Sequence, residues 1–115
     1  KGLDGFNAAL AAATAQRKTV MLDFYADWCV SCKEMEAFTF SDPAVQQALA
    51  DSVLLKADVT PNDAQDKALT KHFGIVGPPA IMFFDKDGNE RRNFRLFGFV
   101  PADEFRAHVE LALRD

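Results

Sequence analysis

The chain has 115 residues, a formal net charge of −4 and a hydrophobic fraction of 49%, with eleven Phe. This length is enough for one domain with its own core, and the composition excludes a mainly disordered chain. The acidic balance argues against a nucleic-acid partner, and no apolar run approaches the roughly 20 residues that a membrane-spanning helix needs. Because the chain begins at Lys1 rather than Met, we expect a single domain, residues 1–115, excised from a larger protein.

The first half of the chain predicts alternating helices and strands. Apolar residues recur at helical spacing in an Ala-rich stretch up to about residue 16. Near-continuous apolar runs over 19–26 and 52–59 are typical of strands covered on both faces. Between them, residues 28–37 indicate a helix, and Ser41-Asp42-Pro43 predicts a second helical start, with a cap residue followed by Pro at the first helical position.

The second half predicts a helix, a β-hairpin and a last helix. Asn62 is the expected cap of a helix that places Gln65, Leu69 and Phe73 on one side and ends at Gly74. Strands over 80–84 and 90–99 flank a turn at 85–88. The buried stripe of the last helix is expected at Phe105, Val109, Ala112 and Leu113. The order α-β-α-β-α-β-β-α predicts an α/β fold, a mixed central sheet with helices on both faces.

Cys29 and Cys32 are the two cysteines of the chain, and they form a Cys-x-x-Cys pair where a strand gives way to a helix. Unpaired backbone N–H groups and the positive end of a helix dipole favour a thiolate at such a position. Cys29 is therefore the expected nucleophile, and Cys32, one turn further, the expected resolving thiol. The chemistry needs no cofactor beyond the disulfide that the two sulfurs form.

Zinc binding is the main alternative use of this cysteine pair. Tetrahedral zinc requires four ligands, and the remaining soft candidates, His72 and His108, stand at no recognisable spacing. We interpret both histidines as structural or surface residues and expect no metal site.

Two carboxylates are the candidate tuning groups for the thiols. Asp23 interrupts the most apolar strand, where burial should raise its pKa and make it a candidate proton acceptor for Cys32. Glu36 lies four residues after Cys32, on the same helical face, and its charge disfavours a neighbouring thiolate. The alternatives are an Asp23 satisfied by backbone or Lys partners and a solvated Glu36; Lys33 is expected to be a surface charge.

Other residues predict the surroundings of the pair. Pro78 and Pro79 enter the strand at 80–84 and suggest a constrained turn, with a cis bond as one option. Trp28 and Tyr25 are interpreted as packing residues at the edge of the site.

The pattern Asp23-x5-Cys29-x2-Cys32 after an apolar strand, with Pro79 opening a later strand–hairpin–helix unit, resembles the thioredoxin fold over the whole chain. Stretches 20–34, 39–43, 57–60 and 62–65 are more closely similar to the C-terminal periplasmic domain of the bacterial thiol:disulfide interchange family DsbD. The dipeptide Val30-Ser31 differs from the Gly-Pro of ordinary thioredoxins and argues against a general cytosolic thioredoxin.

This resemblance implies roles for the residues already named. Cys29 would attack, Cys32 would resolve, and Asp23 and Glu36 would be the acids that tune the site. Pro79 would be a cis-proline beside the disulfide that offers backbone to the partner. Trp28 and Pro78 would shape the partner-binding surface, to which Gly98 and Phe99 would contribute the neighbouring rim.

The resemblance also implies a protein-disulfide reductase that takes electrons from a membrane-embedded domain. It would pass them to an N-terminal periplasmic domain of the same parent, which serves disulfide isomerases and cytochrome maturation. The expected location is periplasmic, as a soluble, monomeric domain of an inner-membrane protein. The residues alone leave open a stand-alone reductase or oxidant, a metal-delivery module with Cys ligands, and a non-catalytic interaction domain.

Overall fold

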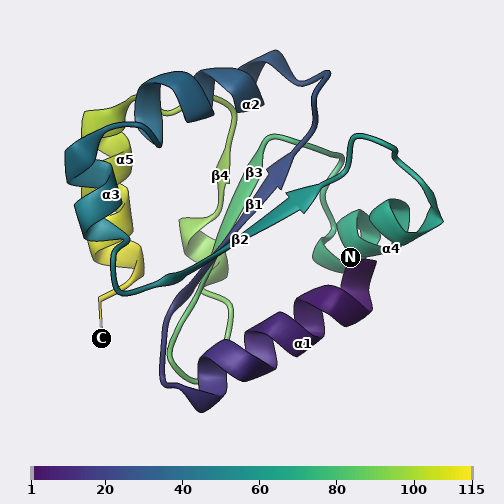
Figure 1. Ribbon diagram of the computed structural model, residues 1–115, viewed down its shortest axis with the longest axis horizontal. Helices are drawn as coiled ribbons and strands as arrows, with labels where there is room; N and C mark the ends of the chain where they lie inside the picture. The colour runs from purple at the N-terminus through teal and green to yellow at the C-terminus, as the bar shows by residue number, and fades with distance from the viewer. Residues whose placement is uncertain (1, 115) are drawn as a thin grey trace.

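The computed structural model describes residues 2–114, and Figure 1 shows a sheet that lies between two groups of helices. The elements are α1 (Gly2–Ala15), β1 (Val20–Tyr25), α2 (Val30–Glu34), the π-helical segment η1 (Met35–Thr39), α3 (Pro43–Ala48), β2 (Val53–Asp58), α4 (Ala64–Phe73), β3 (Ala80–Phe84), the 3-10 turn η2 (Arg92–Phe94), β4 (Leu96–Phe97) and α5 (Ala102–Ala112). Helices α1 and α4 lie on one side of the sheet, and α2, α3 and α5 lie on the other.

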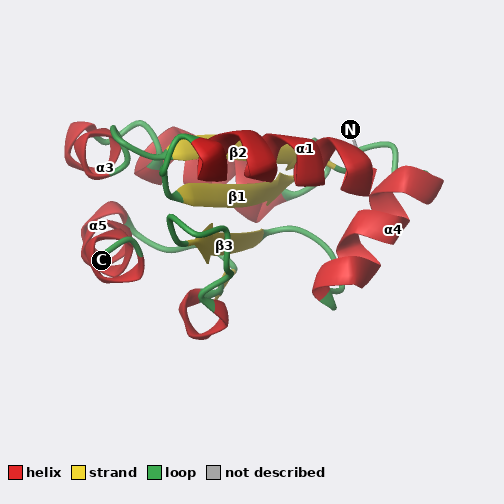
Figure 2. Ribbon diagram, turned by 90° about the horizontal axis from the view of Figure 1, so that it is seen from below, coloured by secondary structure: helices red, strands yellow, loops and turns green. Residues whose placement is uncertain are grey.

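The sheet is mixed, in the order β2-β1-β3-β4, and Figure 2 shows β2, β1 and β3 stacked in that order. Strand β1 pairs in parallel with β2 over its six residues, from Val20↔Val53 to Tyr25↔Asp58. It pairs in antiparallel fashion with β3, and β3 pairs with β4 at only two positions. The predicted α/β architecture is confirmed.

Alternation along β1 divides its side chains between two cores, one on each face of the sheet. Leu22 and Phe24 pack with α1 and α4, where Phe6 and Phe73 meet edge to face at 5.2 Å. Met21 points to the opposite face, among the buried side chains of η1, α3 and α5. Asp23 therefore lies on the face that α2, η1 and α3 cover, two residues along the strand from Met21.

The predicted strand over 90–99 is wrong for most of its length. Glu90 forms an isolated bridge to Phe84, η2 follows, and regular pairing returns only at Leu96–Phe97. Polar side chains explain the interruption: Arg95 binds Glu90 through two hydrogen bonds and donates to the Phe73 carbonyl, and Arg91 donates to the Ala112 carbonyl. The segment stays bonded to β3 at Glu90 and through the Arg91 N–H, which donates to the Phe83 carbonyl at 2.8 Å, and then departs from it where the arginine side chains bind the ends of two helices.

Three further details differ from the predictions. The cysteine helix begins at Val30 and changes at Met35 to a π-helical turn, rather than running as one helix over 28–37. Asp63, not Asn62, caps α4, because Asp63 and Asp66 form a reciprocal capping box. Strand β2 is an edge strand with alternately exposed residues, not a strand buried on both faces.

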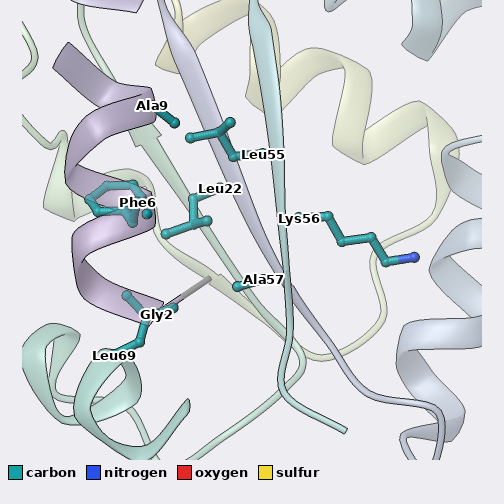
Figure 3. A pocket seen from close by; sticks show the side chains of 9 residues that line it. Gly2, Phe6, Ala9, Leu22, Leu55, Lys56, Ala57 and Leu69 are labelled. Atoms are coloured by element: carbon teal, nitrogen blue, oxygen red, sulfur yellow. The ribbon is translucent and has the colours of Figure 1, made fainter. Parts of the chain in front are cut away.

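A cavity of about 160 Å³ lies where α1 crosses β2 (Figure 3). Phe6, Leu22 and Leu55 line it from α1, β1 and β2, and the side chain of Lys56 points away from it, across the sheet. The two faces of β2 are therefore distinct in chemistry: an apolar one under α1, and one that presents the Lys56 ammonium to the side of α2 and η1.

Candidate active site

The candidate site lies at one end of the sheet, where β1 and β2 end and β3 begins. The parallel β1–β2 pair closes with Tyr25↔Asp58, and the antiparallel β1–β3 pair places Phe24 opposite Ala80, the residue after Pro79. The β3–β4 pair places Phe97 opposite Ala80. The loops after β1, β2 and β4 and the loop before β3 therefore meet at this edge.

Cys29 and Cys32 form a disulfide across the start of α2, and both are largely buried, at 7% and 3% exposure. Cys29 is the N-cap of α2, and its sulfur accepts a hydrogen bond of 3.2 Å from the Cys32 backbone N–H. This confirms the predicted placement of Cys29 beside unpaired helix N–H groups, where an anionic sulfur is stabilised. The Cys32 sulfur lies deeper, 3.7 Å from the carbonyl oxygen of Phe24.

Asp23 precedes Phe24, and burial raises the pKa of its carboxyl from the ordinary value of 3.8 to about 7. Desolvation is the largest cause; the Lys56 ammonium lowers the pKa and the Glu36 carboxylate raises it. The predicted upward shift of this pKa is confirmed. A carboxyl that titrates near neutrality can both accept and release a proton at the pH at which thiols exchange.

Glu36 and Lys56 form an ion pair of 3.0 Å next to Asp23, and the two side chains are 41% and 46% exposed. The β1–β2 register places Lys56 directly beside Asp23, and the Lys56 ammonium lies 3.8 Å from the centre of the Tyr25 ring. A groove of about 400 Å³ is lined by Asp23, Glu36 and Lys56, together with apolar residues of β2 and of the segment that follows α3. Glu36 is thus part of a charged cluster with Asp23 rather than an isolated surface charge.

Thr60 joins the loop after β2 to the cysteine loop. Its hydroxyl accepts a hydrogen bond from the Asp27 N–H at 2.8 Å and donates one to Asp58 at 2.5 Å. Its carbonyl oxygen accepts a hydrogen bond from the Trp28 indole at 3.1 Å. The segment directly before Cys29 is therefore held in place by side-chain and backbone groups of a neighbouring strand end.

The surface around the disulfide is apolar. Trp28 is 59% exposed, so it belongs to this surface and is not a buried packing residue, whereas Tyr25 is buried. The Pro78–Pro79 peptide bond is cis, and both prolines are half-buried. The exposed apolar side chains around the cysteine end are Trp28, Val30, Val76, Phe97 and Phe99. Gly98, at φ +82°, takes the left-handed conformation that turns the chain after β4.

The two histidines lie apart from this site. His108 is bound through Nε2 to the Phe94 carbonyl at 2.7 Å, and His72 is exposed next to the Phe73 ring. Within residues 2–114, no three His, Cys, Asp or Glu side chains gather as a metal site would require. Lys33 is exposed, as predicted.

Sequence reasoning missed two residues of the site, Lys56 and Thr60. The signal for Lys56 was available in principle, since a lysine in an otherwise apolar strand beside the strand of Asp23 is a candidate partner for that carboxyl. Its position opposite Asp23 depends on the strand register, which local sequence does not determine. Thr60 acts through loop contacts that no periodicity encodes.

Comparison with known proteins gives one consistent result. A family model described as a thioredoxin-like domain matches residues 6–113. The chain is 57% identical over 109 residues to the thiol:disulfide interchange protein DsbD of Escherichia coli strain K12. That alignment covers 95% of this chain and 19% of the relative, so the chain spans about a fifth of the length of the curated relatives it matches.

Two solved structures of the DsbD C-terminal domain from Neisseria meningitidis are similar to the chain over nearly their whole lengths. The oxidised form has a TM-score of 0.83 at 40% identity, with 95% of this chain and 94% of that chain covered. The reduced form has a TM-score of 0.77 at 42% identity, with 92% and 96% covered. No helix in the described part of this chain is long and apolar enough to cross a membrane.

Proposed function

Because the chain belongs to the thioredoxin-like family and, within it, to the C-terminal domains of DsbD proteins, we propose that it transfers electrons by dithiol–disulfide exchange. The observation that carries the proposal is the Cys29–Cys32 disulfide at the start of α2, with the outer sulfur at the helix N-cap and the inner one buried behind it. In the reducing direction the domain is a protein-disulfide reductase.

The first step is attack by the Cys29 thiolate on one sulfur of a partner disulfide. A bond forms between Cys29 Sγ and that sulfur, the partner's own S–S bond breaks, and its second sulfur leaves as a thiolate that takes up a proton. The helix N-terminus and the Cys32 backbone N–H stabilise the attacking anion. The exposed apolar surface around Trp28 and Phe99 receives the partner chain.

The second step releases the partner. Cys32 loses its proton and attacks Cys29 Sγ, the mixed disulfide breaks, and the partner sulfur that was bonded to Cys29 departs as a thiolate that takes up a proton. Two electrons have then passed to the partner, and the domain is left with the Cys29–Cys32 disulfide. Asp23 supports this step as the acceptor of the Cys32 proton, because its pKa of about 7 allows it to be ionised near neutral pH and to hold a proton afterwards.

The carboxylates also restrain the dithiol between partners. Negative charge on Asp23 and Glu36 disfavours a thiolate at Cys29, and it opposes the helix N-terminus. The Lys56 ammonium, paired with Glu36, moderates this effect. The reduced domain therefore stays largely protonated until a partner docks, which limits reduction of unintended disulfides in an oxidising compartment.

The likeness to DsbD supports a place for the domain in a larger protein. In the proposal, a membrane-embedded domain of the same parent reduces the Cys29–Cys32 disulfide, and an N-terminal periplasmic domain accepts the electrons. The domain itself is periplasmic and monomeric, and it uses no cofactor other than its disulfide. The chain's coverage of about a fifth of the E. coli relative leaves room for both of these partners.

Trapping the mixed disulfide tests the proposal. With Cys32→Ser, the second step cannot occur, and Cys29 should retain its partner covalently. We expect the isolated variant to capture the N-terminal domain of its parent in non-reducing electrophoresis, and dithiothreitol to release it. Cys29→Ser is the matched control and should capture nothing. Tight Zn²⁺ or Cu⁺ binding by the reduced wild type without disulfide exchange would contradict the proposal and indicate a metal-delivery module.

A further inference from the structure

The segment 98–100 forms one rim of the docking surface, and it leaves the sheet directly beside the site. Strand β4 ends at Phe97, which is paired with Ala80, and Gly98 then turns the chain. The chain then passes η1, with hydrogen bonds that join Val100 to Thr39 and Met35, before it enters α5. Phe99 is 40% exposed on this rim. A two-residue strand cannot by itself fix the position of the segment that follows it.

Two side chains of η1, the direct continuation of the cysteine helix, bind both backbone polar groups of Val100. The Thr39 hydroxyl donates to the Val100 carbonyl at 2.6 Å, and the Val100 N–H donates to the thioether sulfur of Met35 at 3.3 Å. Thr39 is 0% exposed and Met35 is 2% exposed. Val100 itself is half-buried, so its N–H and its carbonyl are both bonded to side chains of the core, and these two bonds fix its position.

The same two residues connect the rim to the sulfurs. Met35 follows Cys32 by three residues, and Thr39 closes the π-helical turn that begins at Met35. A π-helical turn within a helix is often associated with a functional site. Met35 and Thr39, the first and last residues of this turn, face the same backbone segment. The cysteine helix and the rim are therefore joined through Val100.

We propose that Thr39 and Met35 are positioning residues that set Phe99 and its rim relative to Cys29 for recognition of a protein partner. This inference rests on the proposed function, because it concerns how the same site selects its substrate. We expect a small disulfide to react at Cys29 without needing the docking surface. We call the two hydrogen bonds that join Val100 to Thr39 and Met35 the clamp. Loss of the clamp should therefore weaken reaction with a protein disulfide and leave reaction with a small disulfide unchanged.

The test compares Thr39→Val with Thr39→Ser and with Thr19→Val. Valine keeps the size of threonine without the hydroxyl, and serine keeps the hydroxyl. Thr19 is the matched control, since it is also buried and its hydroxyl lies 2.6 Å from that of Ser52, but it precedes β1 at the end of the strand away from the cysteines. Single-turnover reduction of the oxidised N-terminal domain of the parent gives a half-saturation concentration and a limiting rate, and dithiobis(nitrobenzoate) serves as the small disulfide.

We expect Thr39→Val to raise the half-saturation concentration about five- to tenfold, the change that corresponds to one neutral hydrogen bond. The limiting rate, the rate with dithiobis(nitrobenzoate) and the pKa of Cys29 should stay at wild-type values. Thr39→Ser should restore recognition, and Thr19→Val should leave it unchanged. If Thr39→Val does not fold, Met35→Leu removes the sulfur acceptor at nearly constant volume and should shift the half-saturation concentration in the same direction.

A double-mutant cycle with Phe99→Ala identifies what the clamp positions. In the Phe99→Ala background, Thr39→Val should have no further effect. Additive effects, an unchanged half-saturation concentration in Thr39→Val, or equal slowing with both disulfides would each overturn the inference. If the wild type reduces only the small disulfide, the proposed partner is wrong and the inference fails with it. If the wild type reduces both disulfides, the proposed function holds, and the variants then test the role of the clamp alone.

Discussion

An ion pair lies near each of the two edges of the sheet, and these two pairs differ in burial and in role. Arg95 and Glu90, beside β4, are both 12% exposed and joined by two hydrogen bonds of 2.6 and 2.8 Å. Lys56 and Glu36, beside β2, are about half exposed and meet at 3.0 Å. The first replaces missing strand pairing, whereas the second adds charge beside a carboxyl that titrates near neutral pH.

The difference follows from how each edge is built. Strand β2 is held by six backbone residue pairs with β1, so its position does not depend on its side chains. Lys56 can therefore contribute its charge to the site. Strand β4 has two pairs, and the segment before it depends on Arg95, which also donates to the Phe73 carbonyl at 2.8 Å. Removing a partner should therefore affect stability at the β4 edge and thiol chemistry at the β2 edge.

The largest expected effect on stability is at the buried pair. Glu90→Gln leaves the Arg95 guanidinium buried without its counter-charge and should lower the free energy of unfolding by about 3 kcal/mol. Urea denaturation of the oxidised protein measures this change. The exposed pair of Arg17 and Asp87 supplies the control, and Asp87→Asn should change stability by less than about 0.5 kcal/mol. Equal effects of the two variants would remove the contrast between buried and exposed pairs.

Asp23 should give the next largest effect, and its sign depends on pH. The folded-state pKa of about 7 lies above the ordinary value of 3.8, so the folded state holds a proton that the unfolded state releases. The contribution of this group is fully present below about pH 4 and is lost as pH rises through 7. The full difference between the two pKa values corresponds to about 4 kcal/mol, but the Asp23 side chain is only partly buried and solvent screens part of it. Asp23→Asn should thus stabilise the oxidised protein by about 2 kcal/mol at pH 9 and hardly at all at pH 4. A pH-independent difference would contradict the raised pKa.

The smallest effect on stability is expected at the half-exposed pair. Glu36→Gln should change the free energy of unfolding by less than about 1 kcal/mol, because solvent screens the Lys56–Glu36 attraction. Thermal denaturation of the oxidised protein at low and high salt checks this value. A loss similar to that of Glu90→Gln would mean that this pair is structural and not a tuning device.

Sequence patterns predicted correctly those elements whose form depends on residues close together in the chain, such as an apolar run, a proline at a helix start or a glycine at a helix end. The apolar run of β1, the Pro43 helix start, the Gly74 helix end and the cysteine pair at the start of α2 were all confirmed. Helix and strand signals depend on neighbours in the chain, and these elements obey them.

The errors concern features decided by distant contacts. The strand expected over 90–99 is broken because Arg91 and Arg95 reach carbonyl groups at the ends of two helices. Lys56 joins the site through strand register, and Thr39 reaches Val100 across 61 positions of sequence. No local pattern encodes such contacts, so the charged cluster and the clamp emerged only from the structure.

The most direct test measures the pKa of the Cys29 thiol in the reduced protein. The rate of its alkylation by iodoacetamide, recorded as a function of pH, gives this pKa. The central claim is that Asp23 and Glu36 hold the thiol protonated. It predicts a wild-type pKa above the ordinary value of about 8.5. Asp23→Asn and Glu36→Gln should each lower it, whereas Glu34→Gln, which removes an exposed charge from the same helix, should not. A wild-type pKa below 7, or no change in either variant, would contradict the account.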